Sequence, residues 1–149
     1  MYSAVLSIHN IIRWIALVLG ILAAVRAYLG WLGNREWTAM DRKIGSYFTI
    51  TMDIQLLLGL FLYIFLSPIT RTAFQGFGAA MQVGDLRFFI LEHPLYMILA
   101  VIFAHLGSVL SRKAAQSSAK FRRAAIWFSL SVLAIILGMP WMSRLFPGL

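Results

Sequence analysis

The sequence contains no cysteine, and it is poor in acidic residues, histidine and proline. Among its 149 residues there are five Asp and Glu residues, three His residues and four Pro residues. The lack of cysteine excludes disulfides, thiolate metal ligands and CxxC redox chemistry. The sequence also has no phosphate-binding glycine motif and no set of residues typical of a catalytic nucleophile, so any chemistry depends on a few polar side chains.

What the sequence does have is apolar residues, which make up 61% of it, against 12% charged residues. A helix needs roughly 20 apolar residues to cross a bilayer core. Four stretches meet this requirement, at about residues 4–31, 44–66, 88–110 and 121–142. They are too long for strands, and backbone polar groups in lipid must be satisfied within the segment. The sequence therefore predicts an all-α fold, a four-helix transmembrane bundle formed by a single integral membrane domain, 1–149.

The net charge of +8 comes from basic residues between the spans, so we do not expect nucleic-acid binding. Nine of the 13 basic residues lie in two of the three connections. They are Arg26, Arg35, Arg42, Lys43, Arg112, Lys113, Lys120, Arg122 and Arg123. Loops rich in Lys and Arg stay in the cytoplasm. We therefore expect both termini on the non-cytoplasmic side of a bacterial plasma membrane, in a multi-pass protein surrounded by the lipid bilayer.

His9 and His93 each lie about five residues inside a span that starts on the same side, roughly 7 to 8 Å deep. Each heads a stripe of small residues at helical spacing. The stripes are Ala16, Gly20, Ala23 and Ala27 after His9, and Ala100, Ala104 and Gly107 after His93. Such stripes allow close helix approach, or leave room for a flat macrocycle. Two imidazoles from facing helices are axial ligands for haem b, so this pair is a candidate iron site.

Two arginines could offset the charge of haem propionates: Arg13, one turn from His9, and Arg87, on the same side. A simpler interpretation uses the same residues. The histidines would then be hydrogen-bond partners between helices, the stripes would only pack, and Glu92 would form an ion pair with Arg13 or Arg87.

His105 lies 12 positions after His93, which turns it about 120° and moves it about 18 Å along the helix. It belongs to a second site, at a depth that matches Asp53 of the second span. The simple interpretation is a hydrogen bond or ion pair between them, with Arg26 as a further candidate member. The alternative is a proton path or a quinone site, because a buried carboxylate beside an imidazole can titrate near neutral pH.

Four segments carry a family resemblance: SIHNIIRW, DIQLLLGLFLY, LEHPLYMILAVIFAHLGSVLSRK and MPW. They resemble a family of small four-helix bacterial membrane proteins labelled cytochrome b-like, over nearly the whole chain. The resemblance implies b-type haem and electron transfer, with histidines at the positions of His9, His93 and His105. The family often has another histidine where this chain has Asp53. Aspartate is a poor haem ligand, so we expect one haem.

Three functions are therefore compatible with the sequence. The first is a haem b protein that carries electrons, alone or as an accessory subunit of a respiratory or photosynthetic redox complex. The second is a small proton-coupled transporter that uses Asp53 and His105, for which four helices suggest a homodimer. The third is a helical subunit without a cofactor.

Overall fold

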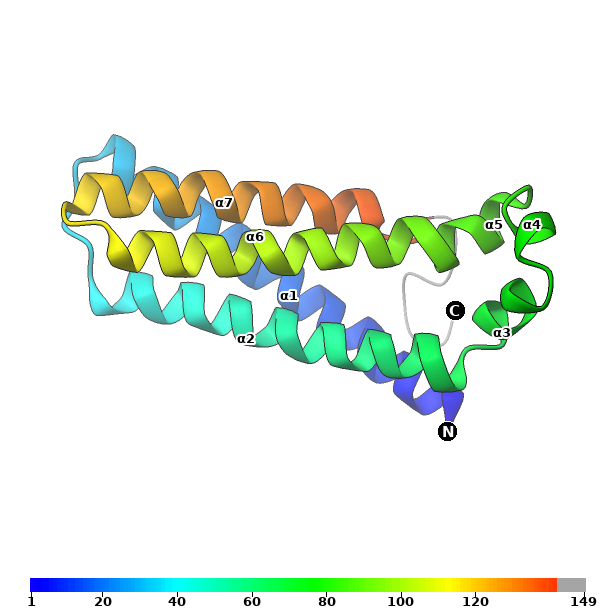
Figure 1. Cartoon of the computed structure of the whole chain (residues 1–149). Coiled ribbons are helices and arrows are strands. Elements are labelled where there is room, and N and C mark those ends of the chain that lie inside the picture. The colour runs from blue at the N-terminus through cyan, green and yellow to red at the C-terminus, as the bar shows by residue number, and fades with distance from the viewer. Residues whose placement is uncertain (142–149) are drawn as a thin grey trace.

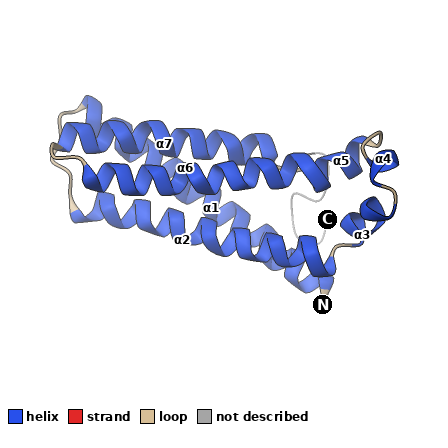
Figure 2. Ribbon diagram, viewed as in Figure 1, coloured by secondary structure: helices blue, strands red, loops and turns tan. Residues whose placement is uncertain are grey.

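The structure, a computed structural model, describes residues 1–141, and this part of the chain is helical and has no strand. Four long helical segments form the bundle (Figures 1 and 2). They are α1 (Tyr2–Leu32), α2 (Ala39–Phe61) with the π turn η1 (Leu62–Leu66), α6 (His93–Lys113), and α7 (Ser117–Gly138). Each is long and apolar enough to cross a membrane, which confirms the predicted fold class and makes the chain a multi-pass membrane protein.

The bounds of the helices differ from those of the predicted spans. Helix α2 begins at Ala39 and not at 44, because Thr38 and Asp41 form a capping box. The Thr38 hydroxyl accepts from the Asp41 backbone N–H at 3.4 Å, and the Asp41 carboxylate accepts from the Thr38 N–H at 2.9 Å. Two N–H groups that a helix start leaves unbonded are thereby satisfied. The fourth span runs over Ser117–Gly138 and not over 121–142, and residue 142 lies outside the described residues.

The connection between α2 and α6 contains helices that the four predicted spans do not include. It forms α3 (Pro68–Gln75), α4 (Phe77–Ala80) and α5 (Gly84–Arg87), which lead through the π turn η2 (Phe88–Glu92) into α6. Ser67 caps α3 with its hydroxyl, and Pro68 fits the first helical position, where no N–H is needed. Figure 1 shows α3, α4 and α5 beyond one end of the bundle, which we call the short-helix end.

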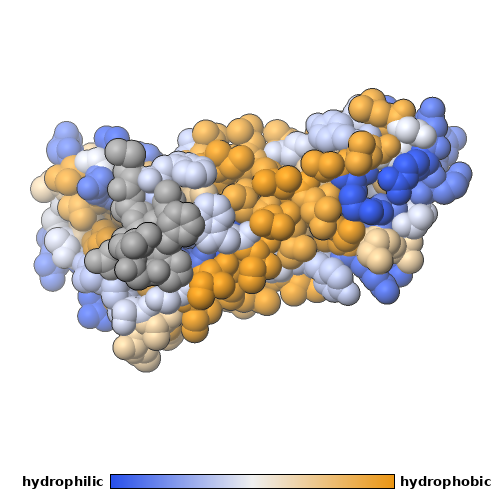
Figure 3. Space-filling model, turned by 180° about the vertical axis from the view of Figure 1, so that it is seen from behind, coloured by the Kyte–Doolittle hydropathy of each residue, from blue (hydrophilic) through white to orange (hydrophobic). Residues whose placement is uncertain are grey.

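The order of packing places α1 and α6 on a diagonal. Helix α1 packs against α2 and α7, and α6 packs against the same two helices. The connections at residues 33–38 and 114–116 lie together at the opposite end, the basic end. In Figure 3 an apolar band crosses the middle of the visible face, and hydrophilic residues gather at its two ends. This distribution is that of a protein whose solvent is lipid in the middle and water at the ends.

The small-residue stripes mostly serve packing, which corrects the expectation that they leave room for a macrocycle along their length. Buried phenylalanines from α2 and α7 fill the space above them: Phe48, Phe121 and Phe128. A Cβ atom added to Gly107 would come within 2.6 Å of the Phe128 ring, and one added to Gly20 within 2.8 Å of Phe48. These rings leave space for a cofactor only beside the part of each stripe that lies near the short-helix end.

Candidate functional site: a histidine pair across the bundle

His9 of α1 and His93 of α6 meet across the diagonal of the bundle near the short-helix end. Their ring centroids lie 6.4 Å apart, and the ring planes are inclined by 71°. Two imidazoles on opposite faces of one metal ion, with metal–nitrogen bonds of about 2 Å, have centroids on the order of 6 Å apart. The spacing is therefore that of an axial ligand pair, as well as that of two rings in edge-to-face contact.

His93 has a fixed orientation. Its Nδ1 lies 2.7 Å from the Gly138 carbonyl oxygen, and a carbonyl only accepts, so Nδ1 carries the proton. This oxygen is available because α7 ends at Gly138, and the last carbonyls of a helix have no helical donor. The Nε2 atom then keeps its lone pair. An imidazole that donates from one nitrogen to a backbone carbonyl is the usual form of a metal-binding histidine.

His9 is 8% exposed and depends on Gln55 of α2. The Gln55 amide nitrogen donates to the His9 carbonyl oxygen at 3.0 Å and lies 3.3 Å from His9 Nε2. The amide nitrogen is a donor, so Nε2 is the acceptor and Nδ1 carries the proton in this tautomer. Within the described residues, neither His9 Nδ1 nor Gln55 Oε1 has a hydrogen-bond partner. Buried polar atoms of this kind are uncommon in folded proteins.

Arg13 adds a positive charge one turn below His9. It is 6% exposed, and its Nη1 donates to the Asn10 side-chain oxygen at 3.3 Å. Its guanidinium also lies 5.6 Å from the centre of the Trp14 ring. A buried guanidinium in lipid is costly unless a polar group or an anion offsets it. Asn10 and Trp14 supply such contacts to Arg13.

A hollow lies beside the pair, with about 320 Å³ of atom-free space when its open mouth is included. This figure counts open surroundings, and the enclosed part of the hollow is about 10 Å³, which holds about one water molecule. All four long helices supply its lining. The lining residues are Arg13, Ala16, Met52, Gln55, His93, Met97, Ile135, Gly138 and Met139.

The start of α6 positions His93 through a widened turn. In η2 the His93 N–H bonds to the Phe88 carbonyl five residues earlier, not four. Such π turns occur often at functional sites. Pro94 follows and has no N–H for the Ile90 carbonyl, and the Tyr63 hydroxyl donates to that oxygen at 2.9 Å. A side chain of η1 thus supports the backbone next to His93.

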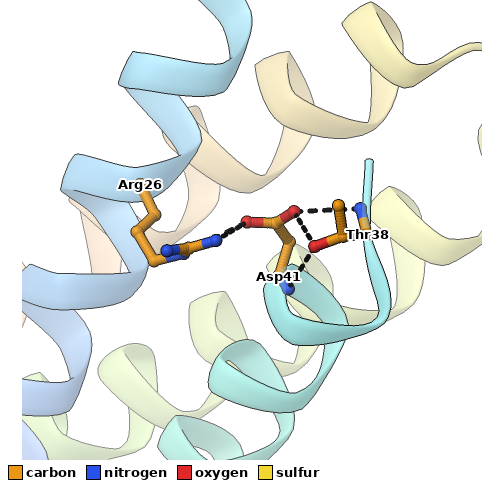
Figure 4. Close-up of polar contacts among 3 residues, drawn as sticks. All are labelled: Arg26, Thr38 and Asp41. Carbon is orange, nitrogen blue, oxygen red and sulfur yellow. Dashed lines mark hydrogen bonds and ion pairs between the residues drawn. The ribbon is translucent and has the colours of Figure 1, made fainter. Parts of the chain in front are cut away.

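Two arginines assigned to sites from the sequence lie elsewhere. Arg87 pairs with Glu92 at 2.8 Å, and both side chains are well exposed at the short-helix end. The structure therefore matches the simpler interpretation of Glu92, which binds the Arg87 guanidinium. Arg26, expected near Asp53 and His105, instead bonds Asp41 through Nε at 3.1 Å and Nη2 at 2.8 Å (Figure 4).

The structure brings Asp53 and His105 together, away from the histidine pair. His105 Nε2 lies 2.7 Å from Asp53 Oδ1. The two side chains are 46% and 48% exposed, so they face the surroundings of the bundle and not its interior. Residues 1–141 contain no cluster of three or more His, Asp or Glu side chains that could hold a metal ion.

Gln55 and the Gly138 carbonyl are the two contributors that the sequence did not reveal. Gln55 could have been found, since a glutamine within an apolar span needs a polar partner. The Gly138 carbonyl could not, because its role depends on where α7 ends.

The chain matches no protein-family model, and no curated protein and no solved structure shows significant similarity to it.

Proposed function

We propose that this chain is a membrane protein that binds one haem b between His9 and His93 and carries electrons. The observation that carries the proposal is the His93–Gly138 hydrogen bond, which leaves His93 Nε2 as a metal-binding lone pair with His9 opposite it. His9 is buried and His93 is half-buried, and two imidazoles from different helices are a donor set that haem b takes. The haem, when bound, would supply one-electron redox chemistry at its iron.

The surrounding residues set conditions on this site. The Gln55 amide would have to leave its 3.3 Å contact with His9 Nε2, and it could keep its 3.0 Å bond to the His9 carbonyl. The hollow is small, so the flexible side chains of Met97 and Met139, which line it, would have to shift. Arg13 is the residue placed to offset a propionate charge, since Arg87 is paired with Glu92.

The proposed location is the plasma membrane of a bacterium, with the basic end in the cytoplasm. The charge distribution supports this orientation, because nine of the 13 basic residues lie within or near the two connections at the basic end. The histidine pair would then lie near the non-cytoplasmic surface, in reach of a redox partner on that side. Service as an accessory subunit of a respiratory or photosynthetic complex is compatible with this position.

A proton-coupled transporter is less well supported. Asp53 and His105 form a pair suited to proton exchange, but their side chains face outward from α2 and α6. A proton path needs polar groups that continue through the interior. The interior at this level is filled by Phe48 and Phe128.

The test is an absorption spectrum of the purified protein, before and after reduction with dithionite. The unmodified protein should show the Soret and α bands of a low-spin b-type haem. His9→Ala and His93→Ala should abolish the low-spin spectrum, and His105→Ala should leave it unchanged. Helical content by circular dichroism provides the folding control. The proposal would be refuted if the purified protein is colourless and the addition of haem produces no low-spin spectrum. It would also be refuted if all three variants keep the spectrum of the unmodified protein.

A further inference from the structure

The Asp53–His105 pair is a polar feature on a surface that should face lipid. The two side chains join α2 to α6 through a 2.7 Å contact, and nearly half of each is exposed. The pair lies 10 residues after Lys43 and seven residues before Arg112 in their helices. At 1.5 Å per residue this is about 15 Å and about 10 Å inside the basic end, which is within a hydrocarbon core of roughly 30 Å.

The neighbours of the pair on this face are apolar and exposed. Ile50 and Leu57, one turn on either side of Asp53, are 53% and 68% exposed, and Ile102, one turn from His105, is 47% exposed. We call this surface of α2 and α6 the α2/α6 face. Lipid tails offer no hydrogen bonds, so ionisable side chains in such a surface are costly unless a polar partner covers them.

Each side chain of the pair has one polar atom left over. Within the described residues, Asp53 Oδ2 and His105 Nδ1 have no hydrogen bond. When the imidazole carries both protons, the pair has no net charge and offers one spare acceptor and one spare donor. A second copy of the same pair, turned by a two-fold axis, presents its donor to this acceptor and its acceptor to this donor. The pair is therefore complementary to itself, as a two-fold interface requires.

We propose that the α2/α6 face is the contact surface of a homodimer. The Nδ1–H of His105 in each copy donates to Asp53 Oδ2 of the other, and the exposed Ile50, Leu57 and Ile102 side chains pack around these bonds. The interface gives all four side chains full sets of partners and removes them from lipid. It is separate from the histidine pair at the short-helix end, so it does not depend on haem binding.

Cysteine cross-linking tests the face directly, because the chain has no native cysteine. Ile102→Cys places a thiol one turn from His105. Ile126→Cys of α7 is the matched control, since the two residues are 47% and 44% exposed and lie at similar depths from the basic end. In proteoliposomes, mild oxidation should convert most Ile102→Cys protein into disulfide-linked dimer and leave Ile126→Cys protein monomeric. Equal cross-linking of both, or none at Ile102→Cys, would overturn the proposal.

Substitution of the pair tests the hydrogen bonds. The dimer population would be measured by single-molecule photobleaching at a series of protein-to-lipid ratios. His105→Ala or Asp53→Ala removes bonds from both halves of the interface, and we expect dimerisation to weaken tenfold or more. The double variant Asp53→His, His105→Asp keeps one donor and one acceptor per copy and should recover most of the loss. The proposal would be overturned if the unmodified protein is monomeric, which is the result expected if a quinone or a lipid headgroup covers the face. It would also be overturned if the single variants dimerise as well as the unmodified protein.

Discussion

The Tyr63 hydroxyl donates a 2.9 Å hydrogen bond to the Ile90 carbonyl oxygen, four residues before Pro94. An α-helical N–H at residue 94 would have bonded this oxygen, and proline has none. Tyr63 belongs to η1 and Ile90 to η2, so the bond joins the two widened turns at the short-helix end. It supports the helix start that carries His93.

Tyr63→Phe should destabilise the protein, because it removes this donor from a part-buried carbonyl. Loss of a partner from a buried polar group costs about 1–3 kcal/mol. Unfolding in mixed dodecylmaltoside and SDS micelles measures the change. Tyr47→Phe is the control, since Tyr47 is 55% exposed. Equal stability of both variants would show that the Tyr63 bond does not support the fold.

Gly107→Ala tests the packing of the small-residue stripe of α6. The added Cβ would lie 2.6 Å from the Phe128 ring, so α6 and α7 must separate or the ring must move. Overpacking of this kind costs about 1–3 kcal/mol. Gly78→Ala is the control, because nothing lies within 4 Å of a Cβ added there. If Gly107→Ala unfolds at the same SDS fraction as the unmodified protein, the stripe is not closely packed against Phe128.

Asp41→Ala should loosen the basic end. It removes the capping box with Thr38 and the two hydrogen bonds from Arg26 (Figure 4). Loss of a helix cap costs about 0.5–2 kcal/mol. Arg26→Ala should add little to Asp41→Ala, because the guanidinium then has no carboxylate to bind. A double-mutant cycle in the same micelles measures this, and fully additive effects would show that the pair does not interact.

The orientation in the membrane can be tested by accessibility. Ala115→Cys and Gly76→Cys place thiols in exposed positions at the basic end and the short-helix end. In intact cells, a membrane-impermeant maleimide should label Gly76→Cys, and Ala115→Cys should react only after the membrane is permeabilised. The reverse pattern would mean that the basic end faces outward, contrary to the charge distribution.

The four spans could be predicted from the sequence because length and apolar composition determine what crosses a bilayer. Their ends could not, since capping adds residues that hydropathy does not count, as Thr38 and Asp41 show at the start of α2. The short helices α3, α4 and α5 were missed for a similar reason. Their polar and glycine residues are typical of a loop, and the contact of Ala73, Ala80 and Ile90 that holds them together spans the whole connection.

The proximity of His9 to His93, and of Asp53 to His105, followed from depth and from helical angle. Depth and angle do not reveal which neighbour fills the space between helices. The small-residue stripes were therefore read as room for a macrocycle, and the structure fills most of that room with Phe48, Phe121 and Phe128. Arg26 was assigned to the wrong carboxylate because depth and angle do not show that Asp41, at the start of α2, lies within reach of its guanidinium.

The widened turn η2 also bears on how such a chain can change over evolution. A π turn contains one residue more than an α turn, and it arises when a single residue is inserted into a helix. An insertion into a regular helix would rotate the two parts against each other by about 100°. The widened turn takes up the extra residue, so the parts on either side keep their directions. Segments on the outer side of residues 88–92 can therefore vary in sequence and length without changing the direction of His93. The surface that meets partners outside the membrane and the side chains that face the bundle interior can then diverge at different rates.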